Sequence, residues 1–201
     1  MEATESLVAA LLQARGYIVS TGYKLWPGTR KTFGGQSISI DIDVHAVDTA
    51  RQRVIVGEVK SYWSSQGISP ESIVEEWTAE GRHHTRLKLI NNKDGVQTVV
   101  WDMLKEQVGA RYKFHSVLFA GKIQNRDEVK SRLEQKQIFD NKARLVVIGD
   151  MIGEFLISYR ERKRRSYIDD PAIATIVAME HSGMLRDDIQ NTETWLSASE
   201  R

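Results

Sequence analysis

Val54-Ile55-Val56-Gly57-Glu58-Val59-Lys60-Ser61 is an apolar segment that ends with a carboxylate and an ammonium two residues apart. Side chains at positions i and i+2 of a β-strand share one face. Glu58 and Lys60 therefore point together, whereas Val59 points into the opposite layer. Charged side chains are seldom buried without a partner, so this pair is the first candidate for chemistry. The alternative interpretation is a solvent-facing salt pair at a strand end.

The segment before it, residues 37–47, predicts the partner strand. Apolar and polar residues alternate with period two, which is typical of a strand with one apolar face. The polar turn at 48–51 then predicts an antiparallel hairpin with residues 54–60. The polar side chains on the first strand are Ser39, Asp41, Asp43 and His45. Pairing across a short turn would bring Asp43 close to Glu58.

Two adjacent carboxylates repel unless a cation lies between them, and hard oxygen ligands favour Mg²⁺ or Mn²⁺ over zinc. The backbone carbonyl of Val59 can supply a further oxygen. A lysine beside such an ion can hold the attacking water and offset charge on a phosphoryl oxygen. Gly57 removes bulk where a backbone or ligand approaches closely. The hairpin therefore predicts a metal-dependent phosphodiester hydrolysis site at Asp43, Glu58 and Lys60.

Asp43-Val-His-Ala followed by Val-Ile-Val-Gly-Glu58-Val-Lys60-Ser resembles the core of the PD-(D/E)XK nuclease superfamily, which includes restriction endonucleases, Mrr-type enzymes and Holliday-junction resolvases. The segment LVAALLQARGYIV after Glu5 resembles the opening helix of these enzymes. The resemblance covers residues 5–61, about a third of the chain. Ile42 stands where the family name has proline.

This resemblance implies a restriction endonuclease-like three-layer sandwich, with a central mixed β-sheet flanked by helices. It implies Mg²⁺, replaceable by Mn²⁺, bound by Asp43 and Glu58, and a lysine, Lys60, that assists the nucleophile. Glu5 is a candidate to support a second ion, or is simply a favourable acid in a first helical turn. Asp41 is the alternative metal ligand, or it contacts the ligands without binding the metal itself. Double-strand cleavage by such small enzymes implies a homodimer.

The composition limits the class of protein but does not identify a function. With 201 residues, the chain can bury a core, and we expect one domain over 1–188 followed by a loosely ordered tail at 189–201. Its net charge of +1 neither indicates nor excludes nucleic-acid binding. The absence of cysteine excludes thiolate metal sites. No apolar run approaches the roughly 20 residues that span a bilayer, so we expect a cytoplasmic protein without membrane association.

The order of predicted elements indicates an α/β sandwich around a mixed sheet. Helices are expected at 5–15, 70–89, 96–108, 126–136, 152–162 and 171–181, strands at 17–19, 23–26, 37–47, 54–60, 113–123 and 143–148, and a glycine-rich loop at 27–37.

Basic residues in three segments are candidates for contact with DNA phosphates. The alternative interpretations are a glycine-rich loop with no such role and solvated helix ends, where cations suit the helix dipole. The candidates are Arg30, Lys31, Arg82, Arg86, Arg162, Lys163, Arg164 and Arg165.

The sequence therefore predicts a Mg²⁺-dependent endonuclease of the restriction or repair type that acts on DNA. A different class also fits: a non-catalytic DNA-binding or assembly module that retains the fold. A third reading, a metal-free α/β protein with a chance ion pair, predicts that Asp43 and Glu58 point apart.

Overall fold

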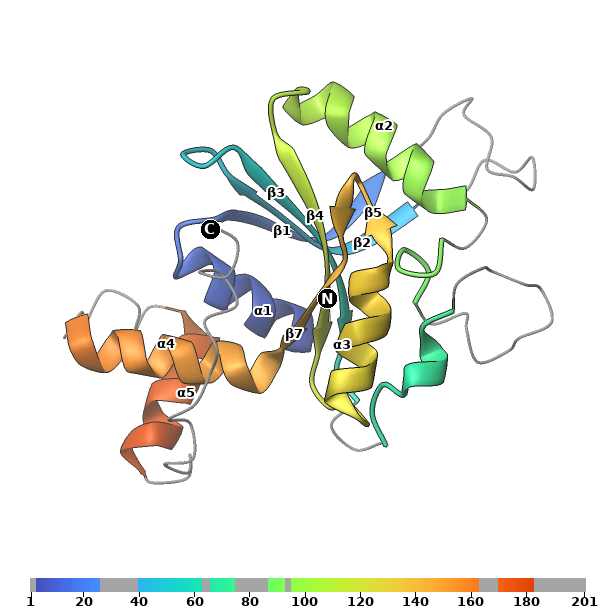
Figure 1. Ribbon diagram of the computed structural model, residues 1–201. Helices are drawn as coiled ribbons and strands as arrows, with labels where there is room; N and C mark the ends of the chain where they lie inside the picture. The colour runs from blue at the N-terminus through green and yellow to red at the C-terminus, as the bar shows by residue number, and fades with distance from the viewer. Residues whose placement is uncertain are drawn as a thin grey trace.

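The computed structural model describes residues 3–25, 40–62, 66–74, 87–92, 95–162 and 170–182. Within these ranges the chain forms helices around a five-stranded sheet and a small two-stranded one (Figure 1). In chain order the elements are α1 (Ala3–Gln13), β1 (Ile18–Leu25), β2 (Ile40–Asp48), β3 (Arg53–Lys60), the 3-10 turn η1 (Pro70–Ser72), α2 (Val96–Val108), β4 (Lys113–Ala120), α3 (Arg126–Gln135), β5 (Gln137–Ile138), β6 (Asn141–Lys142), β7 (Arg144–Val147), α4 (Ile148–Arg162) and α5 (Pro171–His181).

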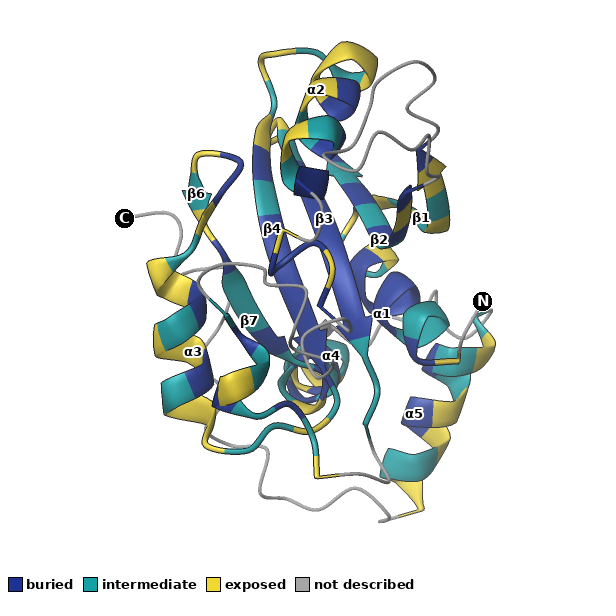
Figure 2. Ribbon diagram, turned by 90° about the vertical axis from the view of Figure 1, so that its right-hand side faces the viewer, coloured by how far each residue is buried: buried dark blue, intermediate teal, exposed yellow. Residues whose placement is uncertain are grey.

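The large sheet is mixed and has the strand order β1-β2-β3-β4-β7. β1, β2 and β3 pair antiparallel, and β3, β4 and β7 pair parallel. The predicted hairpin is confirmed, because Val44 lies opposite Gly57 and Val47 opposite Val54. β3 and β4 lie in the middle and are mostly buried (Figure 2), which explains why residues 54–57 carry no polar side chain.

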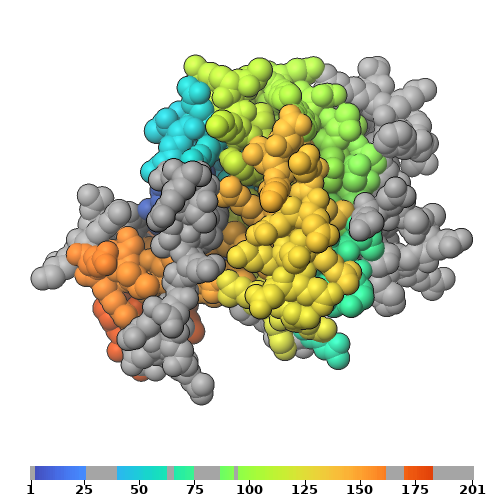
Figure 3. Space-filling model, in the orientation of Figure 1, coloured from blue at the N-terminus to red at the C-terminus, as the bar shows by residue number. Residues whose placement is uncertain are grey.

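Helices cover both faces of this sheet, so the expected α/β architecture with a mixed, helix-flanked sheet is confirmed. Alternate residues of β3 enter different cores: Val54 and Val56 pack on the side of α2 and α3, and Ile55 and Val59 on the side of α1, α4 and α5. Figure 1 shows these two groups of helices on opposite sides. In Figure 3, α3 occupies much of the near face, and α4 and α5 project to one side of it.

The alternation predicted for β2 is confirmed, because every second residue from Ile40 is buried, but the buried residues do not form one apolar face. Ile40 and Ile42 belong to the core beneath α2, whereas Val44 and Ala46 belong to the core beneath α1. The change of side falls at Asp43, where the partner strand β1 carries Gly22 with φ of +56°. Glycine adopts this backbone conformation at little cost. Asp43 therefore lies between the two halves of β2 that enter different cores.

The predicted helix at 70–89 is wrong at both described ends. Pro70 opens only the single turn η1, and Ile73 returns to extended backbone with φ of −98° and ψ of 104°. Residues 88–92 form turns, not a helix. Tertiary burial overrides the local start signal, because Ile73, Leu87 and Ile90 all enter the core beneath α2. Residues 75–86 of this prediction lie outside the described part of the chain.

Other predictions differ from the structure mainly at their ends. Helices α2 and α5 have the predicted bounds. α5 is capped by Asp170, whose carboxylate accepts from the N–H groups of Ala172 and Ile173.

β1 is one strand where two pieces were expected, β4 stops at Ala120, and α4 begins at Ile148 and not at residue 152. The expected loop at 27–37 and the tail at 189–201 lie outside the described residues. None of the described helices combines the length and apolar character needed to cross a membrane.

Candidate active site

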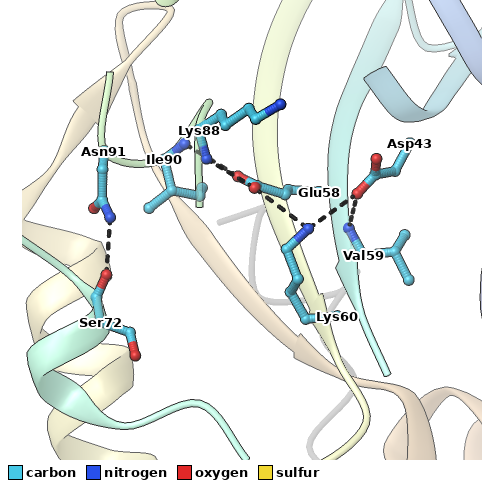
Figure 4. Close-up of polar contacts among 8 residues, drawn as sticks. All are labelled: Asp43, Glu58, Val59, Lys60, Ser72, Lys88, Ile90 and Asn91. Carbon is cyan, nitrogen blue, oxygen red and sulfur yellow. Dashed lines mark hydrogen bonds and ion pairs between the residues drawn. The ribbon is translucent and has the colours of Figure 1, made fainter. Parts of the chain in front are cut away.

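Asp43 lies where β2 leaves its ladder with β3. The recorded pairing of the two strands stops at Val44 opposite Gly57. Beyond that point the carboxylate of Asp43 replaces a backbone acceptor: its Oδ2 accepts a hydrogen bond of 2.8 Å from the N–H of Val59. This bond holds the carboxylate beside β3, next to the strand end that carries Glu58 and Lys60 (Figure 4).

Glu58 is a buried carboxylate with two backbone donors. Only 6% of the residue is exposed. Its Oε1 accepts from the N–H of Lys88 at 2.9 Å, and its Oε2 accepts from the N–H of Ile90 at 3.3 Å. An unpaired buried carboxylate would be strongly destabilising, so the turn at 87–92 is part of the site. These donors fix the direction of the Glu58 side chain.

Sequence reasoning missed this turn and the residue that anchors it. Asn91 is 1% exposed. Its side-chain amide donates to the carbonyl of Ser72 at 2.8 Å and accepts from the N–H of Val74 at 3.1 Å. It thereby ties η1 to the turn that contacts Glu58. The available signal was the run Asn91-Asn92-Lys93-Asp94-Gly95, since Asn, Asp and Gly are typical of turns.

Lys60 lies between the two carboxylates (Figure 4). Its Nζ is 3.5 Å from Oε1 of Glu58 and 3.6 Å from Oδ2 of Asp43. Glu58 and Lys60 come from the C-terminal end of β3 and Asp43 from the neighbouring strand β2, and the three side chains meet at one point. The reading in which Asp43 and Glu58 point apart is therefore wrong.

Burial and charge act against each other at this point. Burial raises the pKa of Glu58 to about 7, although the Lys60 ammonium and the N–H groups of Ile90 and Lys88 act to lower it. Burial acts to lower the pKa of Lys60, but the carboxylates of Glu58 and Asp43 outweigh it and the pKa is raised. Two acids share a single amine here, so negative charge is in excess when both are ionised.

The chemistry of this donor set fits a hard divalent cation. One oxygen of each acid already faces a common positive charge, and a second cation would relieve the remaining negative charge. Asp43, Glu58 and the carbonyl of Val59 offer only oxygen, which suits Mg²⁺ and Mn²⁺. Over the described ranges, no three His, Cys, Asp or Glu side chains gather as metal ligands. The site has two acids and an amine.

Asp41 and Glu5 are not brought to this point by any described contact with the three residues. Asp41 is exposed and lies opposite Lys24 of β1. Glu5 lies in the first turn of α1, whose buried residues pack on the face of the sheet opposite Glu58. The roles predicted for both residues remain predictions.

Glycine is required at position 57 for a different reason from the one expected. A Cβ at this position would lie 2.7 Å from Cε2 of Phe119 and 3.2 Å from Cβ of Val44. Phe119 and Val44 belong to the core beneath α1, on the other side of the sheet from Glu58. The glycine therefore admits an aromatic ring of β4 into the core, and not a ligand into the site.

The side chains of the candidate DNA contacts lie outside the described part of the structure. Arg162 ends α4, and its side chain is outside the described part of the structure. The remaining candidates also lie outside the described residues: Arg30, Lys31, Arg82, Arg86, Lys163, Arg164 and Arg165.

Comparison of the chain with family models, with curated proteins and with solved structures finds no match in any of the three. The geometry of the site and the residues that form it therefore carry the functional argument.

Proposed function

We propose that this protein is a Mg²⁺-dependent endonuclease of the PD-(D/E)XK superfamily that hydrolyses DNA phosphodiester bonds. One observation carries the proposal: the ammonium of Lys60 lies 3.5 Å from Glu58 and 3.6 Å from Asp43. These are the three residues that the motif resemblance names. A chance Glu-X-Lys on a strand has no reason to meet an aspartate from the preceding strand.

Each residue has a distinct task in this proposal. Asp43, Glu58 and the carbonyl of Val59 would hold the cation, which when bound polarises a phosphoryl oxygen and lowers the pKa of water. Lys60 positions the attacking water through its ammonium and offsets charge that develops on the phosphate. The N–H groups of Lys88 and Ile90 keep Glu58 oriented.

The position of the site in the fold supports the same proposal. Lys60 is the last residue of β3, which runs parallel to β4. Ligand sites of open α/β sheets lie outside the carboxyl ends of parallel strands. A mixed sheet flanked by helices is also compatible with a restriction endonuclease-like fold. Mg²⁺, DNA as substrate and a homodimer follow from the family resemblance and belong to the proposal.

One observation favours the alternative, a non-catalytic DNA-binding or assembly module. Both oxygens of Glu58 already accept backbone N–H groups, so Glu58 would have a structural task even without a metal. A carboxylate has further lone pairs for a cation. Calorimetric titration with Mg²⁺ and Mn²⁺, with and without DNA, separates the two functions, because the module binds neither ion at this site.

The proposal is tested with supercoiled plasmid, Mg²⁺ and a matched pair of variants. Asp43→Asn removes a charge from the site, whereas Asp127→Asn makes the same change at an exposed position on α3. We expect wild type and Asp127→Asn to nick or cut the plasmid, and Asp43→Asn and EDTA-treated wild type to leave it intact. Equal cutting by both variants would contradict the proposed site.

A further inference from the structure

A second polar cluster lies at the other end of the sheet, on the face covered by α1 and α4. We call it the basic cluster, and its four residues come from three neighbouring strands. They are Arg53 of β3, Lys113 and His115 of β4, and Arg144 of β7. The proposed function uses none of them.

Strand register places these four side chains together. Arg53 pairs with Lys113 across β3 and β4, and His115 follows Lys113 by two residues on the same face. Arg144 pairs with Val117, two residues beyond His115. All four share the face of Ile55, Val117 and Val146, which enter the core beneath α1 and α4. Neighbours of this kind on adjacent strands lie within reach of long side chains.

Two members of the basic cluster, Arg144 and His115, have no described partner. Within residues 3–25, 40–62, 66–74, 87–92, 95–162 and 170–182, the guanidinium of Arg144 makes no hydrogen bond or ion pair, and the Nδ1 of His115 is buried without a hydrogen-bond partner. Both residues are only partly exposed. A half-buried guanidinium with no acceptor is costly, so the arrangement calls for an anion.

The carboxylates that border the cluster are already engaged. Asp48 accepts from the backbone and the guanidinium of Arg51, each at 2.9 Å. Glu154 of α4 pairs with Arg15. Neither is recorded in contact with Arg144 or His115.

The electrostatics agree with this geometry. Burial and the nearby guanidinium of Arg53 lower the pKa of Arg144. Burial lowers the pKa of His115 to about 4, and the charges of Arg144, Arg53 and Lys113 add to the effect. Positive charge from Arg53, Lys113 and Arg144 is therefore concentrated at this point, and among the described residues no carboxylate pairs with Arg144.

We propose that the basic cluster binds a phosphate group, with Arg144 as its main ligand and His115, Arg53 and Lys113 around it. A guanidinium presents paired N–H donors that match phosphate oxygens. The phosphate can belong to a small phosphorylated molecule or to a nucleic-acid backbone, which offer the same oxygens.

This site is separate from the candidate active site. Arg53 and Lys60 are the first and last residues of β3, and a strand advances about 3.3 Å per residue. One phosphate therefore cannot contact both. The inference does not depend on the proposed function, and it holds even if the protein cuts no DNA.

The test is a calorimetric titration of the protein with inorganic phosphate, in EDTA and at constant ionic strength. EDTA removes the cation required at the other site. Wild type should bind phosphate saturably, and Arg144→Gln should weaken this binding by about tenfold or more, the loss expected for a charge-assisted hydrogen bond. Arg144→Lys should retain part of the affinity because it keeps the charge. Lys142→Gln removes an exposed positive charge from β6 and should change nothing.

A second arm uses a short duplex DNA without terminal phosphates. Weaker DNA binding by Arg144→Gln, with no effect of Lys142→Gln, would identify the backbone as the source of the phosphate. Far-ultraviolet circular dichroism shows whether each variant is folded, and a Lys60→Ala background keeps the result independent of cleavage. The proposal is overturned if folded Arg144→Gln and Arg144→Lys bind both phosphate and DNA as tightly as wild type does, or if wild type binds neither.

Discussion

The carboxylate of Asp43 accepts the N–H of Val59 at 2.8 Å, at the point where β2 and β3 cease to pair as strands. The same oxygen lies 3.6 Å from the ammonium of Lys60. In the proposed site Asp43 would therefore have two separable tasks, since the hydrogen bond needs any oxygen acceptor, whereas cation binding needs a negative charge.

Substitutions of Asp43 should separate these tasks. Asp43→Asn keeps an oxygen acceptor for Val59, so we expect its free energy of unfolding to stay within about 1 kcal/mol of wild type. Asp43→Ala leaves the N–H of Val59 without its acceptor and should lose about 1–3 kcal/mol. Urea unfolding measures both values. Equal destabilisation by the two substitutions would mean that charge, and not the hydrogen bond, stabilises this strand end.

Glu58 should make the stability of the metal-free protein depend on pH. Its pKa is raised to about 7 in the folded protein from an ordinary value of 4.5. The folded state thus holds this proton more strongly than the unfolded state. The resulting stabilisation is complete below about pH 4.5 and is lost as pH rises towards 7, to a total on the order of 3 kcal/mol.

The measurement for Glu58 is urea unfolding in EDTA between pH 4.5 and 8, compared with Glu58→Gln. Subtracting the variant cancels titrations that both proteins share, including that of His115. We expect the difference to favour wild type at acid pH and to shrink as pH rises. A difference that does not vary with pH would show that Glu58 titrates normally.

Substitution of Gly57 should reduce stability through the core and not through the site. In Gly57→Ala the new Cβ would lie 2.7 Å from the ring of Phe119, and overpacking of this kind costs about 1–3 kcal/mol. Phe119→Leu in the same chain should recover part of that loss, because it removes the atoms that clash. Urea unfolding of the two single variants and the double variant measures this. If the double variant loses more free energy of unfolding than the losses of the two single variants add up to, the close contact is not the cause.

Lys60→Met should uncouple cation binding from cleavage. The ammonium lies between Asp43 and Glu58 and competes with a cation for the same oxygens. Its removal should therefore leave the affinity for Mg²⁺ unchanged or raise it, while hydrolysis is lost. Calorimetric titration of the variant with Mg²⁺ checks this. A large loss of affinity would assign Lys60 to the support of the carboxylates.

The sequence predicts the hairpin and the proximity of Asp43 to Glu58 because this information is local. The alternation in residues 40–47 and the short turn to Arg53 set the register that brings Asp43 towards Glu58. The same locality explains the correct bounds of α2 and α5, since Gly109 follows one and Asp170 precedes the other.

The errors occur where distant contacts decide the outcome. Pro70 is a valid helix start, yet Ile73 and Leu87 are taken into the core and the described ends of the expected helix do not form. The N–H donors to Glu58 come from residues 30 and 32 positions away, and backbone donors leave no mark in side-chain identity. Gly57 looks the same in sequence whether it faces a ligand or the ring of Phe119.

The central claim is that two acids and an amine on neighbouring strands form a hydrolytic centre. Cleavage of supercoiled plasmid by Lys60→Ala tests it most directly. The matched control is Lys24→Ala, which removes an exposed lysine from β1. With Mg²⁺, wild type and Lys24→Ala should convert the plasmid to nicked or linear DNA, and folded Lys60→Ala should not. Cleavage by Lys60→Ala at the wild-type rate would contradict the assignment.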